Sequence, residues 1–316
     1  MNGLQVPDFG VLFRGSARLG ALVAGLGIPW IHTRAFITAF ADELNRYQEL
    51  SVDGDGQAIG VMTRGCTRDF GLRVARFLDV AGCGEREVRR FLVRARYFEY
   101  RDILFKVEID ETGMREFSYY VHTRPRLPVA RAWLADCGVD DAAWSRVAAC
   151  AAALDKRTTH FLACSIDSGQ PSLQKVYFSQ PIDDGVWTRI DAAARAWDGR
   201  EQCFEVLAEH RELLARESLF VSVSFRGPEP VAGLKLDARC VPPELVASML
   251  PGRPSTLERF ELLRHLFGKE RYDYVGLRPE QSTRLAARAY CYDDQRASSR
   301  IPASAPEARS SRESSE

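Results

Sequence analysis

The sequence predicts an α+β fold in which about ten antiparallel strands close into a β-barrel and the helices lie outside it. Two observations predict this fold. Five segments each hold two runs of alternating apolar and polar side chains joined by a short turn, which is the pattern of a β-hairpin. The sequence between the hairpins has helical spacing instead. Because each hairpin already returns antiparallel, these helices cannot be crossovers of a parallel sheet, and five hairpins supply enough strands to close without exposed edges.

The predicted hairpins follow one another along the chain. In order, they pair residues 49–53 with 57–64, 102–110 with 117–124, 159–167 with 172–179, 219–226 with 231–241, and 272–278 with 284–292. Four of the connections contain glycine, which supplies the backbone conformations that tight turns require. These connections are Gly54-Asp55-Gly56, Glu111-Thr112-Gly113, Ser168-Gly169 and Gly227-Pro228.

Helical sequence separates the hairpins. Apolar side chains recur at helical spacing at residues 133–147, 187–197 and 257–267. The third stretch follows a Ser-Thr pair and ends at Gly268, which suit the two ends of a helix. The run 89–96 interleaves arginine with apolar residues, and in a neutral protein we interpret it as a solvated helix face rather than a nucleic-acid contact.

The composition is that of a globular protein, and the length fits one large domain or two small ones. We expect residues 1–295 to form a single barrel domain. Residues 296–316 are rich in Ser, Arg and Glu with almost no apolar side chains, and we expect them to be disordered.

Charge and composition exclude several function classes. The 316 residues are 46% hydrophobic, and 43 basic side chains balance 43 acidic ones, so no overall field attracts nucleic acid or an anionic membrane. We find no secretory signal and no apolar run long enough for a membrane helix. The eight cysteines lack a CxxC pair and the five histidines lack an HxxxH or HExxH pattern, which favours reduced thiols and argues against a transition-metal site. We therefore expect a cytoplasmic protein without a transition-metal site, and we expect it to be a monomer.

Four predicted strands carry charged or phenolic side chains on one face and apolar side chains on the other. These polar faces hold Lys106 and Glu108; Lys175 and Tyr177; Lys235, Asp237 and Arg239; and Arg288 and Tyr290. If helices cover the outside, the apolar faces must meet them and the polar faces must line the lumen. The alternative is that the charges are simply solvated on an exposed sheet face. The recurrence of the pattern in four strands favours the lumen.

A lumen with lysine, arginine and tyrosine side chains suits a particular kind of ligand. Cations and phenolic hydroxyls bind a diphosphate, and aromatic faces stabilise a carbocation and exclude water. The pattern therefore indicates a ligand with a concentrated negative charge and an apolar, cation-forming tail.

The repeated unit and the segment 174–179 (QKVYFS) resemble the aromatic prenyltransferases of the αββα (PT) barrel type. Two further segments look most like the cyanobactin-type peptide prenyltransferases: 218–224 with 233–235, and 274–276 with 288–292. The resemblance spans about residues 30–294. One departure is Asp237, which stands between Lys235 and Arg239 where an aromatic residue is more typical.

The resemblance implies roles for individual residues. A diphosphate clamp would comprise Arg64, Lys106, Lys175, Lys235, Arg239 and Arg288. A tyrosine shield over the allylic cation would comprise Tyr177, Tyr274 and Tyr290. Glu49, on the first strand, would take the proton of the acceptor, although a solvated carboxylate at a helix end is an equally good interpretation of this residue.

The resemblance implies transfer of an isoprenyl group from an allylic diphosphate, such as dimethylallyl diphosphate, to an electron-rich acceptor. Acceptors of this kind include a phenol, an indole, a guanidinium or a residue of a ribosomal peptide. No cofactor is predicted, and Mg²⁺ bound with the diphosphate stays open. The alternative is a non-catalytic carrier of a phosphorylated or acidic lipid, which needs the cations but not Glu49. A metal-dependent phosphoester enzyme would want a dense carboxylate cluster, and the sequence has no DDxxD-type motif.

Overall fold

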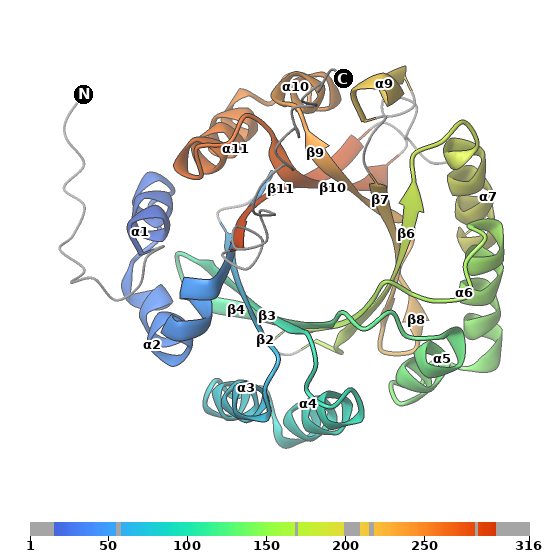
Figure 1. Cartoon of the computed structure of the whole chain (residues 1–316), viewed down its shortest axis with the longest axis horizontal. Helices are drawn as coiled ribbons and strands as arrows, with labels where there is room; N and C mark the ends of the chain where they lie inside the picture. Colours follow the sequence, from blue (N-terminus) through green and yellow to red (C-terminus); the bar gives the residue numbers. More distant parts are fainter. Residues whose placement is uncertain are drawn as a thin grey trace, which may run out of the picture.

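Ten long strands form a closed antiparallel barrel with helices around it, as the computed structural model shows (Figure 1). The structure describes residues 16–54, 58–167, 170–198, 209–214, 218–281 and 284–294. The predicted tail 296–316 and the turn Ser168-Gly169 lie outside the described residues. The strands are β1 (Tyr47–Asp53), β2 (Ile59–Gly65), β3 (Ile103–Asp110), β4 (Gly113–Val121), β5 (Phe161–Asp167), β6 (Leu173–Pro181), β7 (Ser218–Arg226), the short β8 (Glu229–Pro230), β9 (Lys235–Val241), β10 (Tyr272–Gln281) and β11 (Arg284–Asp294).

The barrel closes because the first and last long strands of the sheet order pair with each other. The strand order is β6-β5-β4-β3-β2-β1-β11-β10-β9-β7, and β7 pairs with β6 to complete the circle. β1 pairs with β11, so the first and last strands are neighbours in the barrel. In each hairpin, the first strand ends and the second strand begins at the same end of the barrel, and the helices are connected to the strands at the other end. We call these the turn end and the helix end. The predicted closed antiparallel barrel is confirmed.

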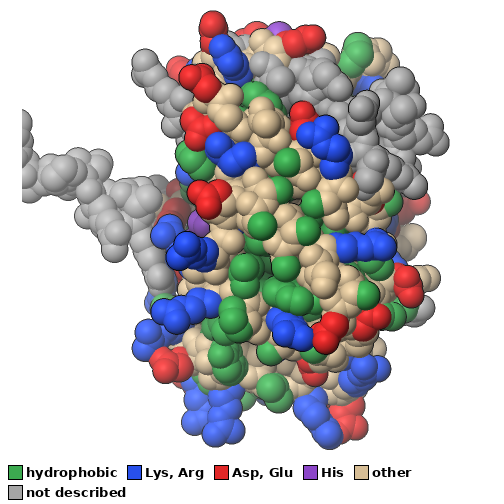
Figure 2. All heavy atoms as spheres, turned by 90° about the vertical axis from the view of Figure 1, so that its right-hand side faces the viewer, with side chains coloured by type: hydrophobic (Ala, Val, Ile, Leu, Met, Phe, Trp, Pro, Cys, Tyr) green, Lys and Arg blue, Asp and Glu red, His purple; other side chains and the backbone are tan. Residues whose placement is uncertain are grey.

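The helices form the outer layer (Figure 1). They are α1 (Ser16–Gly25), α2 (Ile31–Arg46), α3 (Arg68–Val80), α4 (Glu85–Tyr97), α5 (Leu127–Ala135), α6 (Asp141–Ala153), α7 (Val186–Asp198), α9 (Arg211–Leu214), α10 (Pro243–Met249) and α11 (Pro254–Leu266). On the face covered by α5, α6 and α7, basic and acidic side chains are interspersed (Figure 2). This face therefore carries no concentrated charge that would attract a polyanion.

The fourth hairpin differs from its prediction. The strand expected from residue 231 begins only at Lys235, with the two-residue β8 before it. The backbone between them is bonded to the outer layer: the Trp197 indole donates to the Val231 carbonyl (2.9 Å), and the Gly233 amide donates to the Asp198 carboxylate (2.7 Å). These bonds with α7 replace the sheet ladder at that point.

Each strand divides the interior into two environments. Outward-facing residues such as Phe105, Val176 and Phe178 belong to the main hydrophobic core, which they share with helix residues such as Trp197. A separate inner cluster consists of Ala163, Tyr177 and Phe220, with Tyr120, Phe161 and Tyr274 packed against it. The apolar strand faces thus meet the helices, and the interpretation that the polar faces line the lumen is confirmed.

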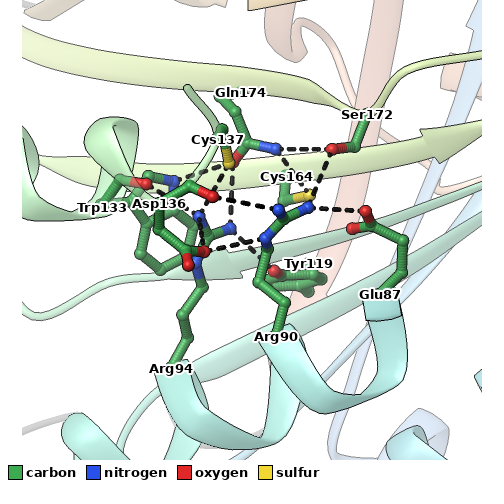
Figure 3. A network of polar contacts seen from close by, with 10 residues as sticks. All are labelled: Glu87, Arg90, Arg94, Tyr119, Trp133, Asp136, Cys137, Cys164, Ser172 and Gln174. Atoms are coloured by element: carbon green, nitrogen blue, oxygen red, sulfur yellow. Dashed lines mark hydrogen bonds and ion pairs between the residues drawn. The ribbon is translucent and has the colours of Figure 1, made fainter. Parts of the chain in front are cut away.

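The interpretation of the basic run as a solvated face is wrong for Arg90 and Arg94, which α4 buries against the barrel (Figure 3). Arg94 donates to the Tyr119 hydroxyl (3.0 Å), to Gln174 Oε1 (3.0 Å) and to the Trp133 carbonyl (2.8 Å). Both arginines also bond Asp136, at 2.8 and 3.2 Å. These acceptors come from distant parts of the chain, so local spacing could not predict the burial.

We expect Arg94→Met to lower the free energy of unfolding by about 2–4 kcal/mol, because it leaves buried acceptors without their charged donor. The matched control is Arg89→Ala on the same helix. Arg89 is 74% exposed and pairs with Glu85, which is 84% exposed. We therefore expect the Arg89→Ala variant to lose no more than about 0.5 kcal/mol of unfolding free energy. Urea unfolding measures both values. Equal losses in the two variants would show that the network in Figure 3 does not stabilise the fold.

In the part of the chain that the structure describes, no helix is long and apolar enough to cross a membrane. The seven cysteines in this part form no disulfide with one another.

Candidate active site

A pocket lies in the lumen of the barrel. Its unfilled space is about 590 Å³, counting the part open to solvent. The lining residues come from strands all around the barrel: Tyr47, Glu49, Met62, Leu104, Tyr120, Phe161, Tyr177, Phe220, Lys235, Asp237, Tyr274 and Tyr290.

Aromatic rings cover much of the pocket wall. Their centroids follow one another at 5.5–6.2 Å, through the pairs Tyr47–Tyr292, Tyr292–Tyr274, Tyr274–Phe220, Phe220–Phe161, Phe161–Tyr177 and Tyr177–Tyr120. Burial raises the pKa of the Tyr177, Tyr274 and Tyr290 phenols, so they stay neutral. All three predicted shield tyrosines therefore lie in one pocket.

Sequence reasoning missed three rings of this wall: Tyr120, Phe161 and Phe220. The available signal was their alternation, since each lies on the inward face of its strand. Phe161 is opposite Tyr177 in the register of β5 and β6.

Glu49 is a buried carboxylate in the pocket wall. It is 7% exposed, and the Tyr47 hydroxyl donates to its Oε2 at 2.9 Å. Burial raises the pKa of Glu49 to about 7, although the Tyr47 hydrogen bond and the Lys106 charge oppose the rise. The burial excludes the interpretation of Glu49 as a solvated carboxylate. A carboxyl group with this pKa exchanges a proton near neutral pH.

Three predicted cations in the lumen already have carboxylate partners. Lys106 Nζ lies 2.6 Å from Glu108 Oε1, and Lys235 Nζ lies 2.6 Å from Asp237 Oδ1. Arg288 pairs with the same Glu108 and with Asp53. Burial opposes ionisation of Arg288, but these two carboxylates raise its pKa well above the ordinary value.

Two inward cations have no carboxylate at ion-pair distance among the described residues. Lys175 Nζ donates to Ser165 Oγ at 2.8 Å, and Arg278 donates to Ser224 Oγ at 3.3 Å. Burial lowers the pKa of Lys175 to about 8; Glu116 opposes this change, and the like charges of nearby lysines and Arg278 add to it. Burial likewise lowers the pKa of Arg278. Both groups would gain from a bound anion.

Arg278 is a candidate that the sequence analysis missed. It lies on the same face of β10 as Tyr274 and Gly276, so the two-residue alternation was the available signal. Steric contact explains why residue 276 is glycine: a Cβ there would lie 2.5 Å from Asp237 Oδ1 and 2.8 Å from Lys235 Cε. Glycine thus lets the Lys235 side chain lie across β10.

The predicted diphosphate set is divided between the two ends of the lumen. Lys175, Lys235 and Arg288 lie toward the turn end of their strands, and Lys106 lies near mid-strand. Arg64 and Arg239 lie at the helix end. Arg64 pairs there with Asp102 and Asp294, and the Arg239 guanidinium lies 5.6 Å from the Tyr274 ring centroid. The lumen therefore presents a cation group at the turn end, which we define as Lys106, Lys175, Lys235, Arg278 and Arg288, next to the aromatic pocket.

Several solved structures share this architecture. PriB in its binary complex with product diphosphate superposes with a TM-score of 0.62 at 14% identity, over 86% of this chain and 93% of that chain. The 6-dimethylallyltryptophan synthase from Micromonospora olivasterospora, in complex with DMASPP and Trp, gives 0.60 at 14% identity over 86% and 94%. The fold is that of the αββα prenyltransferase barrel. NotF in complex with brevianamide F and DMSPP gives 0.59 at 10% identity over 88% and 92%.

No family model matches the sequence, and no curated protein matches it. The resemblance to αββα prenyltransferases is thus confirmed for the fold, while the closeness to the cyanobactin type stays a prediction.

Proposed function

We propose that this protein transfers a prenyl group from an allylic diphosphate to an electron-rich acceptor inside the lumen. The observation that carries the proposal is the position of Lys175 and Arg278, two cations without carboxylate partners among the described residues, beside an aromatic pocket that contains a buried carboxylate. The structures of similar fold are named for prenyl transfer or are complexes with prenyl donors or diphosphate, which agrees with this arrangement.

The donor's diphosphate would bind at the cation group. Charge-assisted hydrogen bonds from Lys175 and Arg278 stabilise the negative charge that grows as the allylic C–O bond breaks and its electron pair goes to the diphosphate. The allylic cation then lies among the faces of Tyr177, Tyr274 and Tyr290, which stabilise positive charge and keep water away. In this proposal the cations of the protein bind the diphosphate, and Mg²⁺ bound with the diphosphate stays open. The described residues include no group of three or more His, Cys, Asp or Glu side chains arranged to hold a metal ion.

The acceptor would attack the cation from the side of the pocket that contains Glu49. Its π-electrons or lone pair form the new bond to carbon, and the proton it loses passes to the Glu49 carboxylate. At a pKa of about 7, a large fraction of Glu49 is ionised at neutral pH and ready to accept this proton.

The acceptor is an aromatic ring in our proposal, because the pocket offers stacking faces around most of its wall. The similar structures contain Trp or brevianamide F. A second possible acceptor is a residue of a ribosomal peptide. In that case the peptide must enter the pocket through its opening to solvent.

The test is incubation of the full chain with dimethylallyl or geranyl diphosphate and separate acceptors: tryptophan, a phenol, an arginine peptide and a tryptophan peptide, each with Mg²⁺ and with EDTA. We expect a product heavier by one prenyl group in mass spectrometry with an indole or phenol acceptor. Binding of the diphosphate without any prenylated acceptor would favour the lipid-carrier alternative and contradict the proposal.

A further inference from the structure

Four polar side chains at the helix end of the lumen are linked by consecutive hydrogen bonds, and we call this series the hydrogen-bonded chain. Arg64 donates through Nε to Asp102, and Asp102 Oδ2 lies 3.1 Å from His122 Nδ1. His122 Nε2 in turn lies 3.1 Å from Nε2 of His160. His122 follows β4 and His160 precedes β5, so the two adjacent strands bring together histidines that are 38 residues apart in sequence.

The chain ends against the pocket wall. The His160 ring lies 4.5 Å from the Phe161 ring and 4.6 Å from the Phe220 ring, centroid to centroid, and both phenylalanines line the pocket. β5 is four strands away from β1 around the ring, so His160 and Glu49 flank the pocket from different sides. Next to His160 in this series of hydrogen bonds, the His122 side chain is 29% exposed, so the series has access to solvent.

The charges determine where the protons lie. Burial opposes ionisation of Asp102, but hydrogen bonds from His122 and Arg64 lower its pKa, so Asp102 is an acceptor and His122 Nδ1 must donate. With Nδ1 donating to Asp102, Nε2 of His122 is the atom that accepts from the Nε2–H of His160. His160 is left with a lone pair on Nδ1, for which the described residues offer no hydrogen-bond partner.

A proton would not remain on His160. Burial lowers the pKa of His160 to about 4, together with the charged or titratable groups that face this ring, His122, Arg124 and Arg239. The Asp102 carboxylate lies next to His122 instead, 3.1 Å from its Nδ1. Within this set of side chains, a positive charge therefore lies nearest to a counter-charge on the His122 side.

We propose that Asp102, His122 and His160 form a proton relay that provides a second proton acceptor for the lumen. The inference rests on the proposed prenyl transfer. The transfer releases one proton: an aromatic carbon that is prenylated loses it to Glu49, whereas an acceptor that is prenylated at nitrogen or oxygen loses it to the relay instead. In the relay step, the N–H or O–H bond of the acceptor breaks and leaves its electron pair on the acceptor, while a bond forms to His160 Nδ1. The Nε2–H of His160 moves to His122 Nε2, and the resulting imidazolium is stabilised by Asp102. His160 is the catalytic residue, and His122 and Asp102 are positioning residues.

The first test requires no activity. Side-chain ¹⁵N NMR of the full chain at pH 8, with resonances assigned through the His122→Gln and His160→Gln variants, reports the tautomer of each ring. We expect the Nδ1–H tautomer for His122 and the Nε2–H tautomer for His160. The Nδ1–H tautomer on His160 would overturn the proposal whether or not prenyl transfer is observed.

The second test is kinetic and uses an acceptor that the wild-type enzyme prenylates at nitrogen or oxygen. We expect His160→Gln to lower kcat for this acceptor by about 10–100-fold, because it removes the group that takes the N–H or O–H proton, to leave donor affinity unchanged, and to be partly rescued by added imidazole. His265→Gln is the control, because this histidine lies on α11 with its side chain 68% exposed. Full activity of His160→Gln across the pH range, or a loss that imidazole does not rescue, would contradict the relay.

Discussion

Replacing Glu49 with glutamine is expected to reduce kcat by about 10²–10⁴-fold, the usual contribution of a general base. The amide keeps the shape of the carboxyl group but cannot accept the proton. Donor affinity should change little, because the cation group at the turn end does not include Glu49. For a phenol or an indole, which loses its proton after the cation is attacked, we expect the lower end of this range.

The pH dependence has a definite sign. Glu49 must be ionised to act as a base, and burial raises its pKa to about 7, so the wild-type kcat/KM for the acceptor should fall as the pH is lowered through about 7. The Glu49→Gln variant should lack this limb. Glu43→Gln is the matched control: Glu43 is also 7% exposed but lies on α2 and pairs with Arg73 outside the lumen. Full turnover in Glu49→Gln would assign the base to another residue.

Replacing Lys175 or Arg278 with alanine is expected to weaken binding of the prenyl diphosphate by about 10–150-fold in each case, the value of one charge-assisted hydrogen bond of about 1.5–3 kcal/mol. In the described part of the structure, the hydrogen-bond partners of these two cations are serine hydroxyls. The diphosphate therefore displaces no described carboxylate from them. Lys106, Lys235 and Arg288 must instead share their charge with Glu108, Asp237 and Asp53.

Calorimetric titration with a thiolodiphosphate analogue, whose bond between the prenyl carbon and sulfur does not break, measures these affinities. Arg195→Ala on the exposed face of α7 is the control and should bind as the wild type does. Wild-type affinity in both Lys175→Ala and Arg278→Ala would place the diphosphate elsewhere in the molecule.

The barrel was predictable because its main signals are local. Alternation with a period of two identifies a strand, and a glycine turn identifies a hairpin, within about twenty residues of sequence. The first hairpin, which has only a short first run, also forms, as β1 and β2. Where a long-range contact competes with the sheet, prediction failed: the bonds from Trp197 and Asp198 to residues 231–233 shorten the strand that became β9.

The site was predictable in part. Alternation placed Lys175, Tyr177, Lys235 and Tyr290 on one face, and closure of the barrel brings them together. It could not tell which end of the lumen a residue occupies, and this is why Arg64 was grouped with Lys175. It also gave no weight to Arg278, which stands alone as a cation on its strand. The alternation of Arg90 and Arg94 with apolar residues suggested exposure. Apart from Glu87, which is three residues from Arg90, the acceptors that hold these arginines in place are 25 or more residues away in sequence, where local spacing does not reveal them.

The central claim is that the lumen both binds an allylic diphosphate and transfers its prenyl group. The most direct measurement is a single-turnover experiment with dimethylallyl diphosphate labelled in the prenyl carbons and an indole acceptor, in which diphosphate release and label in the acceptor are followed together. The account predicts one labelled acceptor for each diphosphate released, with both rates reduced equally in Lys175→Ala at subsaturating donor. Diphosphate release with the label appearing only in free prenyl alcohol, or bound donor that is never consumed, would contradict it.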